Sequence, residues 1–169
     1  MTTRARKTTT GDSGVEVQIT PDGQVTKIVL RDGTGAAPPP KGSLVTVHYV
    51  GRTPDGRIFD QSRNHGSPFE FKLGAGYVIK GWDSGVATMK VGEKALLSCG
   101  SNYAYGADGI NDGMTLIPPN ATLEFEVELL SWREDKSLPI LQLSIVLFVA
   151  LLAWYILWFE PSQRATASS

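Results

Sequence analysis

The chain has 169 residues, 41% of them hydrophobic, and a formal net charge of −1 at neutral pH. This balance argues against nucleic acid as the main partner, because phosphate binding usually needs a concentrated basic face. The average composition combines two unlike parts, because residues 138–159 carry no charge, and this excludes a uniformly soluble protein. The polar remainder is long enough for one domain of common size.

The first segment, residues 1–14, is polar and carries Arg4, Arg6 and Lys7 among five threonines. No apolar run follows these basic residues, so we predict a disordered N-terminus without a secretory signal peptide. We expect the folded domain to begin at residue 15 and to continue to residue 133.

Two strand-like runs, residues 15–20 and 24–30, open the predicted domain. Pro21-Asp22-Gly23 between them is typical of a tight turn, because proline presets φ and glycine accepts a positive φ. We therefore predict a β-hairpin. Residues 31–42 contain three glycines and three consecutive prolines, which predict an extended surface connection.

Further strands are predicted from the alternation of apolar and polar residues. Residues 44–50 place Val45, Val47 and Tyr49 on one face. Residues 69–73 alternate in the same way, and residues 123–129 have the cleanest two-residue period in the chain. The glutamates of this last run are most simply a solvated sheet face, and a pair of catalytic carboxylates is the alternative.

Between these strands, residues 78–89 have the spacing of an amphipathic helix, because Trp82, Val86 and Met89 recur at i, i+4 and i+7. One short helix against an antiparallel sheet predicts an α+β domain. The only cysteine, Cys99, lies in a strand-like run and is expected to be a buried small side chain. A lone cysteine cannot form an internal disulfide, which fits a reducing compartment.

After a short linker, residues 134–137, the segment Leu138–Phe159 has 22 residues, 19 of them apolar. A helix of this length is about 33 Å long, which matches the roughly 30 Å hydrocarbon thickness of a bilayer. Trp154, Tyr155 and Trp158 gather near its end, as at a membrane interface. We predict a transmembrane helix, whose bound partner is the lipid bilayer.

Only residues 160–169 follow this segment, which predicts a tail-anchored protein with its domain in the cytosol. Arg133 and Lys136 on the domain side agree with the positive-inside rule. A single basic residue in the tail, Arg164, favours the endoplasmic reticulum slightly over the mitochondrial outer membrane.

Several kinds of chemistry have no motif here. His48 and His65 are the only histidines, and no cysteine cluster accompanies them, so we predict no metal site. No complete dinucleotide fingerprint or phosphate loop occurs, so we expect no cofactor. Asn120-Ala121-Thr122 is a glycosylation sequon, which a cytosolic domain would not have modified.

What remains is a set of aromatic residues with Asp60 and Arg63 nearby in the sequence. Aromatic walls with a few polar groups are typical of a small-molecule or peptide pocket. Aromatic residues in strands are also common in ordinary cores, and this alternative stays open from the residues alone. The aromatic set is Tyr49, Phe59, Phe69, Trp82, Tyr105 and Phe125.

The order of six motifs resembles the FKBP-type peptidyl-prolyl cis-trans isomerases, the receptors of the macrolide rapamycin. The similarity runs from about Val25 to Trp132 and implies a bent antiparallel sheet wrapped around one short helix, to which the predicted transmembrane helix is added. The motifs are Val47–Gly51, Phe59–Arg63, Pro68-Phe69, Val78–Trp82, Tyr103–Gly106 and Ile117–Leu123.

The resemblance assigns a role to each matching position. Trp82 is implied to be the pocket floor, with Val78 and Ile79 beside it. The backbone N–H of Ile79 and the hydroxyl of Tyr105 are implied to hold ligand carbonyls, and Asp60 to be the polar group low in the pocket. The walls are implied to be Tyr49, Phe59, Phe69 and Phe125, and the rim Leu116 and Ile117.

Two positions and one loop depart from the family pattern. His65 stands where many members have an arginine, so the ion pair expected with Asp60 is either lost or becomes pH dependent; the alternative is that His65 is a plain loop residue. Tyr77 stands at a rim position that is commonly acidic, and the loop 108–116 is longer than in the shortest members.

The resemblance implies a membrane-tethered enzyme that rotates X-Pro peptide bonds in proteins and thereby assists their folding. Its implied partners are proline-containing polypeptides and macrolides such as rapamycin. Rotation makes and breaks no covalent bond, so an apolar pocket that favours the twisted amide is sufficient and no nucleophile is required. The alternative is a non-catalytic module that uses the same pocket to recruit a partner to a membrane.

Overall fold

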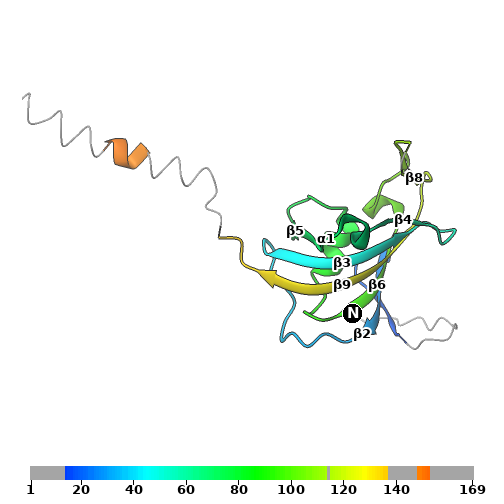
Figure 1. Ribbon diagram of the computed structural model, residues 1–169, viewed down its shortest axis with the longest axis horizontal. Coiled ribbons are helices and arrows are strands. Elements are labelled where there is room, and N and C mark those ends of the chain that lie inside the picture. The colour runs from blue at the N-terminus through cyan, green and yellow to red at the C-terminus, as the bar shows by residue number, and fades with distance from the viewer. Residues whose placement is uncertain (1–13, 114, 137–147, 153–169) are drawn as a thin grey trace, which may run out of the picture. The chain divides into compact units, whose positions relative to one another are not determined.

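The computed structural model describes residues 14–113, 115–136 and 148–152 (Figure 1). The contacts divide the chain into two units, Met1–Asp135 and Lys136–Ser169. In the first unit, β-strands surround a short α-helix, and in the second the described residues 148–152 are helical.

The first unit is built on one antiparallel sheet in the order β1-β2-β6-β9-β3-β4, with β5 also paired to β3. A separate two-stranded sheet joins β7 and β8. The strands are β1 Glu16–Gln18, β2 Val25–Arg31, β3 Leu44–Arg52, β4 Ile58–Gln61, β5 Phe69–Lys72, β6 Lys94–Cys99, β7 Ile110–Asn111, β8 Leu116–Ile117 and β9 Leu123–Arg133. The helix is α1 Lys80–Val86, and short 3-10 turns cover Ser62–His65 and Ser101–Tyr103.

The predicted hairpin is confirmed, because β1 pairs with β2 around the Pro21-Asp22-Gly23 turn. The Asp22 carboxylate accepts hydrogen bonds from the Thr20 hydroxyl, at 2.6 Å, and from the Gln24 backbone N–H, at 3.2 Å. Gly23 follows with a φ of 70°, which favours glycine. A short polar side chain and a glycine therefore fix this turn locally.

Strand β9 is the centre of the sheet and is bonded to β3 on one side and β6 on the other. Its inward residues Leu123, Phe125, Val127 and Leu129 are all buried, as the alternation predicts. The glutamates of the other face make ion pairs at the surface: Glu126 with Lys94 and Glu128 with Arg31. They are spread along a charged sheet face, as the simpler interpretation expects.

Four strands differ from the sequence predictions. β4 and the β7–β8 pair were not predicted, because the burial of their residues does not alternate. β9 continues to Arg133, four residues past the predicted end at Leu129, because an irregular register against Thr46 and Val47 breaks the alternation there. The strand is therefore longer than the run of alternating residues that predicts it.

Helix α1 is shorter than the predicted range 78–89 at both ends. Val78 and Ile79 precede it in non-helical backbone, and Thr88 and Met89 follow it in turns that bond to Gly85 and Val86. Met89 is nevertheless fully buried with Trp82 and Val86, so the apolar stripe is correct although the helix ends before it does.

Two glycines let α1 approach β6 closely. A Cβ atom on Gly81 would lie 2.4 Å from the sulfur of Cys99, and one on Gly85 would lie 2.7 Å from Leu97. This close approach buries Cys99 completely and brings Trp82 over the sheet. Burial raises the pKa of the Cys99 thiol to about 12, which leaves it unreactive at neutral pH.

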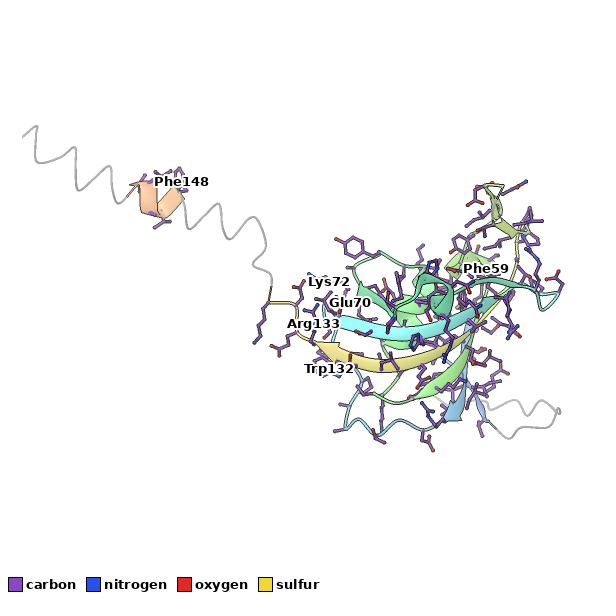
Figure 2. All side chains as sticks on the ribbon, viewed as in Figure 1. Phe59, Glu70, Lys72, Trp132, Arg133 and Phe148 are labelled. Atoms are coloured by element: carbon purple, nitrogen blue, oxygen red, sulfur yellow. The ribbon has the colours of Figure 1, made fainter. Side chains whose placement is uncertain are left out.

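The C-terminal end of β9 is held by ion pairs to β5. Arg133 contacts Glu70 at 2.9 Å, and Asp135 contacts Lys72 at 2.8 Å. Figure 2 shows Glu70, Lys72 and Arg133 at one end of the sheet and Phe59 toward the other. These two ion pairs hold the last residues of the first unit against β5.

Candidate active site

A cavity of about 470 Å³ opens between the start of α1 and the strands β3, β4, β5 and β9. This volume is within the range of small-ligand pockets. The structure brings together the seven residues to which the resemblance assigns the catalytic floor, walls and polar groups, and it places Val78 and Ile79 beside them. The cavity is lined by Tyr49, Phe59, Asp60, Phe69, Tyr77, Val78, Ile79, Trp82, Tyr105 and Phe125.

Trp82 lies at the base of the cavity and is only 5% exposed. Tyr49 of β3 and Phe125 of β9 meet its indole ring nearly at right angles, with centroid distances of 4.9 Å and 5.4 Å. Phe69 of β5 makes a third such contact at 6.1 Å. Edge-to-face rings pack favourably, so three strands and the helix hold the floor in one orientation.

Gly51 of β3 is a site residue to which sequence reasoning gave no role. A Cβ atom there would lie 2.8 Å from the ring of Phe59 and 3.0 Å from the ring of Phe125. These two rings meet at 5.8 Å in an edge-to-face contact that a side chain at position 51 would disturb. The absence of a side chain at Gly51 leaves space for the rings of Phe59 and Phe125. In the sequence, only the position of Gly51 in the Val47–Gly51 motif could have indicated this.

The polar group of the cavity is Asp60, on β4. Its carboxylate accepts hydrogen bonds from the Tyr49 hydroxyl at 2.5 Å and from the Gln61 backbone N–H at 2.8 Å, and it pairs with His65 at 2.9 Å. Burial acts to raise the pKa of Asp60, but these hydrogen bonds outweigh burial and hold the pKa below its ordinary value of 3.8. Asp60 is therefore a carboxylate at neutral pH.

His65 lies at the end of the 3-10 turn Ser62–His65 with its Nε2 on Asp60. The interpretation of His65 as a plain loop residue is wrong, and so is the loss of the Asp60 pair. The turn that follows β4 brings residue 65 back to residue 60, which a reading of neighbouring residues alone does not reveal. Both side chains remain substantially exposed.

Two tyrosines face this carboxylate with raised pKa values. Burial is the larger cause for Tyr49, and its hydrogen bond to Asp60 adds to it. For Tyr105, burial acts first and the charge of Asp60 second. Both hydroxyls keep their protons at neutral pH, so both can donate hydrogen bonds.

Ile79, whose backbone N–H precedes the first turn of α1, lines the cavity. None of the hydrogen bonds among the described residues uses it as a donor. The structure therefore offers a free amide donor at the position to which the resemblance assigns a ligand carbonyl.

The two implied rim residues do not line the cavity. Ile117 of β8 is 2% exposed and belongs to the hydrophobic core, whereas the side chain of Leu116 is 52% exposed. Arg57, in the turn between β3 and β4, donates a hydrogen bond to the Leu116 carbonyl and links the β7–β8 hairpin to the sheet. Tyr77, which the resemblance places at a rim position, does line the cavity.

The described part of the chain contains no group of three or more potential metal ligands. The cavity therefore offers ring surfaces, one paired carboxylate and a few hydrogen-bond donors. These groups can enclose an apolar ring and hold carbonyl oxygens.

Comparison with known proteins places these features in a family. The family model of FKBP-type peptidyl-prolyl cis-trans isomerase matches residues 35–130. The chain is 53% identical over 105 residues to FK506-binding protein 1 of Dictyostelium discoideum, which covers 62% of this chain and 94% of that protein. It is 50% identical over 103 residues to peptidyl-prolyl cis-trans isomerase Fkbp12 of Drosophila melanogaster, covering 61% and 93%.

Longer proteins match as well. FK506-binding protein 59 of Drosophila melanogaster is 50% identical over 125 residues, which are 73% of this chain but only 28% of that protein. The crystal structure of the three FKBP domains of wheat FKBP73 superimposes with a TM-score of 0.66 at 36% identity, covering 72% of this chain and 52% of that one. The chain belongs to the FKBP-type peptidyl-prolyl cis-trans isomerase family and is an enzyme of that class.

Proposed function

We propose that the first unit rotates X-Pro bonds by enclosing the prolyl ring over Trp82, and that residues 138–159 tether this activity to a membrane. The observation that carries the first part is the aromatic cavity itself, whose floor and walls are fixed by edge-to-face contacts from three strands. Its roughly 470 Å³ can hold a prolyl ring and its flanking peptide groups.

The mechanism follows from the electronic structure of the amide. A planar X-Pro amide carries separated charge that water stabilises, and rotation passes a barrier of about 18 to 20 kcal/mol at which resonance is lost. The twisted amide has less charge separation, so transfer to an apolar, water-excluding cavity favours it over the planar form. No nucleophile takes part.

The polar groups orient the substrate in this mechanism. The Ile79 N–H and the Tyr105 hydroxyl each hold a substrate carbonyl. Asp60, which lines the cavity, is bonded to Tyr49 and His65, so its charge is already partnered when the substrate enters. The same surfaces are proposed to bind macrolides such as rapamycin.

The activity is tested by following cis-trans isomerisation of a proline peptide with the full chain in a mild detergent. We expect catalysis that rapamycin inhibits, and a loss of about 10- to 100-fold in kcat/KM for Phe59→Ala, because the cavity then admits water. Leu30→Ala, an exposed residue outside the cavity, is the control. Peptide binding without catalysis would support a non-catalytic recruiting module instead.

The tether is supported by the composition of residues 138–159, of which 19 are apolar and none is charged. Most of this predicted helix lies outside the described residues. Its described part, residues 148–152, is helical, and the side chains of Phe148, Val149, Leu151 and Leu152 are exposed there (Figure 2). Among the residues that the structure describes, no helix has the length and apolarity needed to cross a membrane.

Alkaline carbonate extraction of membranes from cells that express the full chain tests the tether. We expect the wild type to stay in the membrane fraction and a Val149→Arg/Leu152→Arg variant to be released, because each arginine costs about 2.5 to 3.5 kcal/mol in mid-membrane. Leu30→Arg, in the first unit, is the matched control. Release of the wild type would contradict the tether.

We propose that the first unit faces the cytosol. Cys99 is a free thiol, as in reducing compartments, and Arg133 and Lys136 precede the apolar segment. The exposed sequon residue Asn120 is a built-in reporter, because a lumenal domain could be glycosylated there. A glycosidase-sensitive mass shift that Asn120→Gln removes would contradict the cytosolic orientation.

The membrane is proposed to be that of the endoplasmic reticulum, with the mitochondrial outer membrane as the alternative. Imaging the full chain with a tag at its N-terminus, against markers of both organelles, distinguishes the two.

A further inference from the structure

Ser62, the first residue of the 3-10 turn that follows β4, is the least exposed polar residue that the structure describes, with 0% of its surface accessible. It does not line the cavity, and the resemblance implies no role for it. Burying a hydroxyl costs free energy unless hydrogen bonds replace those that it makes to water. The partners of this hydroxyl therefore indicate what its burial achieves.

Three groups of strand β3 surround the Ser62 hydroxyl. Its oxygen accepts a hydrogen bond from the Tyr49 backbone N–H at 3.1 Å, and it lies 2.9 Å from Nδ1 of His48 and 3.4 Å from the Tyr49 carbonyl oxygen. A hydroxyl has one proton to donate and two lone pairs, so these three partners can use its whole hydrogen-bonding capacity. Ser62 is therefore attached to β3 through its side chain.

This attachment begins where the ladder between β3 and β4 ends. The last pair of that ladder is Val50 with Gln61. The next residues on the two segments are Tyr49 and Ser62, and here the serine hydroxyl bonds to the backbone of the tyrosine. The side chain of Ser62 thus holds the turn to β3 beyond the point at which backbone pairing stops.

Both sides of this attachment lead to the carboxylate of Asp60. The Tyr49 hydroxyl donates to one carboxylate oxygen at 2.5 Å, and Nε2 of His65, at the end of the same turn, lies 2.9 Å from the other oxygen. We propose that Ser62 is a positioning residue: by fixing its turn to β3, it places His65 on Asp60. This inference rests on the proposed isomerase function and concerns the polar side of the same cavity.

The position of His65 has a consequence for substrate binding. A carboxylate in an apolar cavity is costly to desolvate unless its charge is partnered. In the proposed mechanism Asp60 takes no part in the rotation itself, so this cost falls equally on the bound substrate and on the transition state. Weaker positioning of His65 should therefore raise KM and leave kcat nearly unchanged.

The first test follows the Asp60 pKa by carboxyl carbon NMR, with the full chain in a mild detergent. Burial acts to raise this pKa, and the hydrogen bonds of Tyr49 and His65 act to lower it. We expect Ser62→Ala to raise the Asp60 pKa, and to raise it much less in a His65→Ala background, where the contact is already absent. Ser43→Ala, at a buried serine that does not line the cavity, is the matched control and should leave the pKa unchanged.

An unchanged Asp60 pKa in folded Ser62→Ala would overturn the proposal, and so would equal rises in the wild-type and His65→Ala backgrounds. A role in stability alone would give the first of these results. Ser62→Cys keeps a weaker donor and acceptor, so it should give a smaller rise in the same direction. This variant carries the test if Ser62→Ala does not fold, and no rise in it would then overturn the proposal.

The second test measures isomerase kinetics of the same variants. We expect KM to rise about two- to tenfold in Ser62→Ala with kcat nearly unchanged, which is the size expected from one net hydrogen bond. A lower kcat with an unchanged KM would overturn the proposal. Failure of the proposed function looks different, because the wild type would then be inactive while the Asp60 pKa would still report the position of His65.

Discussion

The N-terminal and C-terminal ends of helix α1 lie in very different surroundings. At the first end, Trp82 forms the floor of an open cavity, and its buried indole N–H has no hydrogen-bond partner among the described residues. Past the second end, the Lys27 ammonium bonds to the Glu93 carboxylate at 2.8 Å and to the Thr88 carbonyl at 3.0 Å.

The second region is closed as well as partnered. The other oxygen of Glu93 accepts the Lys90 N–H at 2.9 Å, and the side chains of Lys27 and Glu93 are only 8% and 7% exposed. Nothing there is left for a ligand. The two ends of α1 therefore have different roles. The buried Lys27–Glu93 pair beyond the C-terminal end stabilises the fold, and Trp82 at the N-terminal end forms the floor of the cavity.

Removing the charge of Glu93 should have the largest effect on stability. We expect Glu93→Gln to lower the free energy of unfolding by about 3 to 5 kcal/mol, because it leaves the buried ammonium of Lys27 without its counter-charge. Urea denaturation of the full chain measures the loss. At temperatures where the variant stays folded, kcat/KM should change little, since neither residue lines the cavity.

Two controls accompany this variant. Lys27→Met/Glu93→Leu removes both charges and should lose less than Glu93→Gln alone. Alkylation of the buried Cys99 reports opening of the domain and should be faster in Glu93→Gln than in wild type. A stability loss below about 1 kcal/mol in Glu93→Gln would show that the closed end does not hold the fold.

Two glycine substitutions, one in the cavity wall and one near the C-terminal end of α1, separate the two regions further. Gly51→Ala places a Cβ 2.8 Å from Phe59, and Gly85→Ala places one 2.7 Å from Leu97. Overpacking should cost each variant about 1 to 3 kcal/mol. Only Gly51→Ala moves cavity walls, so its kcat/KM should fall at least about tenfold, since misplacement by about 1 Å can cost 100-fold.

Denaturation and isomerase assays of the two variants supply the measurements. Equal losses of kcat/KM in Gly51→Ala and Gly85→Ala would mean that the two ends are coupled, and the distinction between them would fail.

The smallest expected effect concerns the His65–Asp60 pair at the open end. His65→Ala removes a hydrogen bond that lowers the Asp60 pKa, so that pKa should rise in the variant, which a carboxyl carbon NMR titration measures. The pair is exposed, so the loss in stability at neutral pH should be at most about 1 kcal/mol.

The pH dependence of this contribution has a definite sign. Folding lowers the Asp60 pKa, so its stabilising contribution is present above the ordinary value of 3.8 and is lost as the pH falls through the lower folded value. An Asp60 pKa that stays the same or falls in His65→Ala would contradict the role of the pair.

Much of the closed framework was predictable from local pattern. The Pro-Asp-Gly turn gave the first hairpin, and the alternation of residues 123–129 identified the central strand, because burial on one face leaves a two-residue period. The short β4 and the β7–β8 pair left no such period and were missed. The ends of α1 were also wrong, because glycine packing and following turns decide where the helix stops.

Only the part of the site that is contained in the ordered motifs was predictable. The aromatic residues and Asp60 stand in a recognisable sequence, and the structure gathers them around one cavity. The proximity of His65 to Asp60 and the space that Gly51 leaves for two rings depend on backbone paths through separate elements. Leu116 and Ile117 show the reverse, since matching motif positions did not place them on the cavity lining.

The position of β9 has a mechanical consequence. This strand has 11 residues, is bonded along both edges, to β3 and β6, and its end continues directly into the segment that leads to residue 136. A pulling force applied through that segment acts along the strand and loads both hydrogen-bond ladders in shear, so that many bonds resist together. Pulling at the short edge strand β1 would instead strip its few bonds in turn, so the domain should resist extraction far better from its C-terminal side than from its N-terminal side.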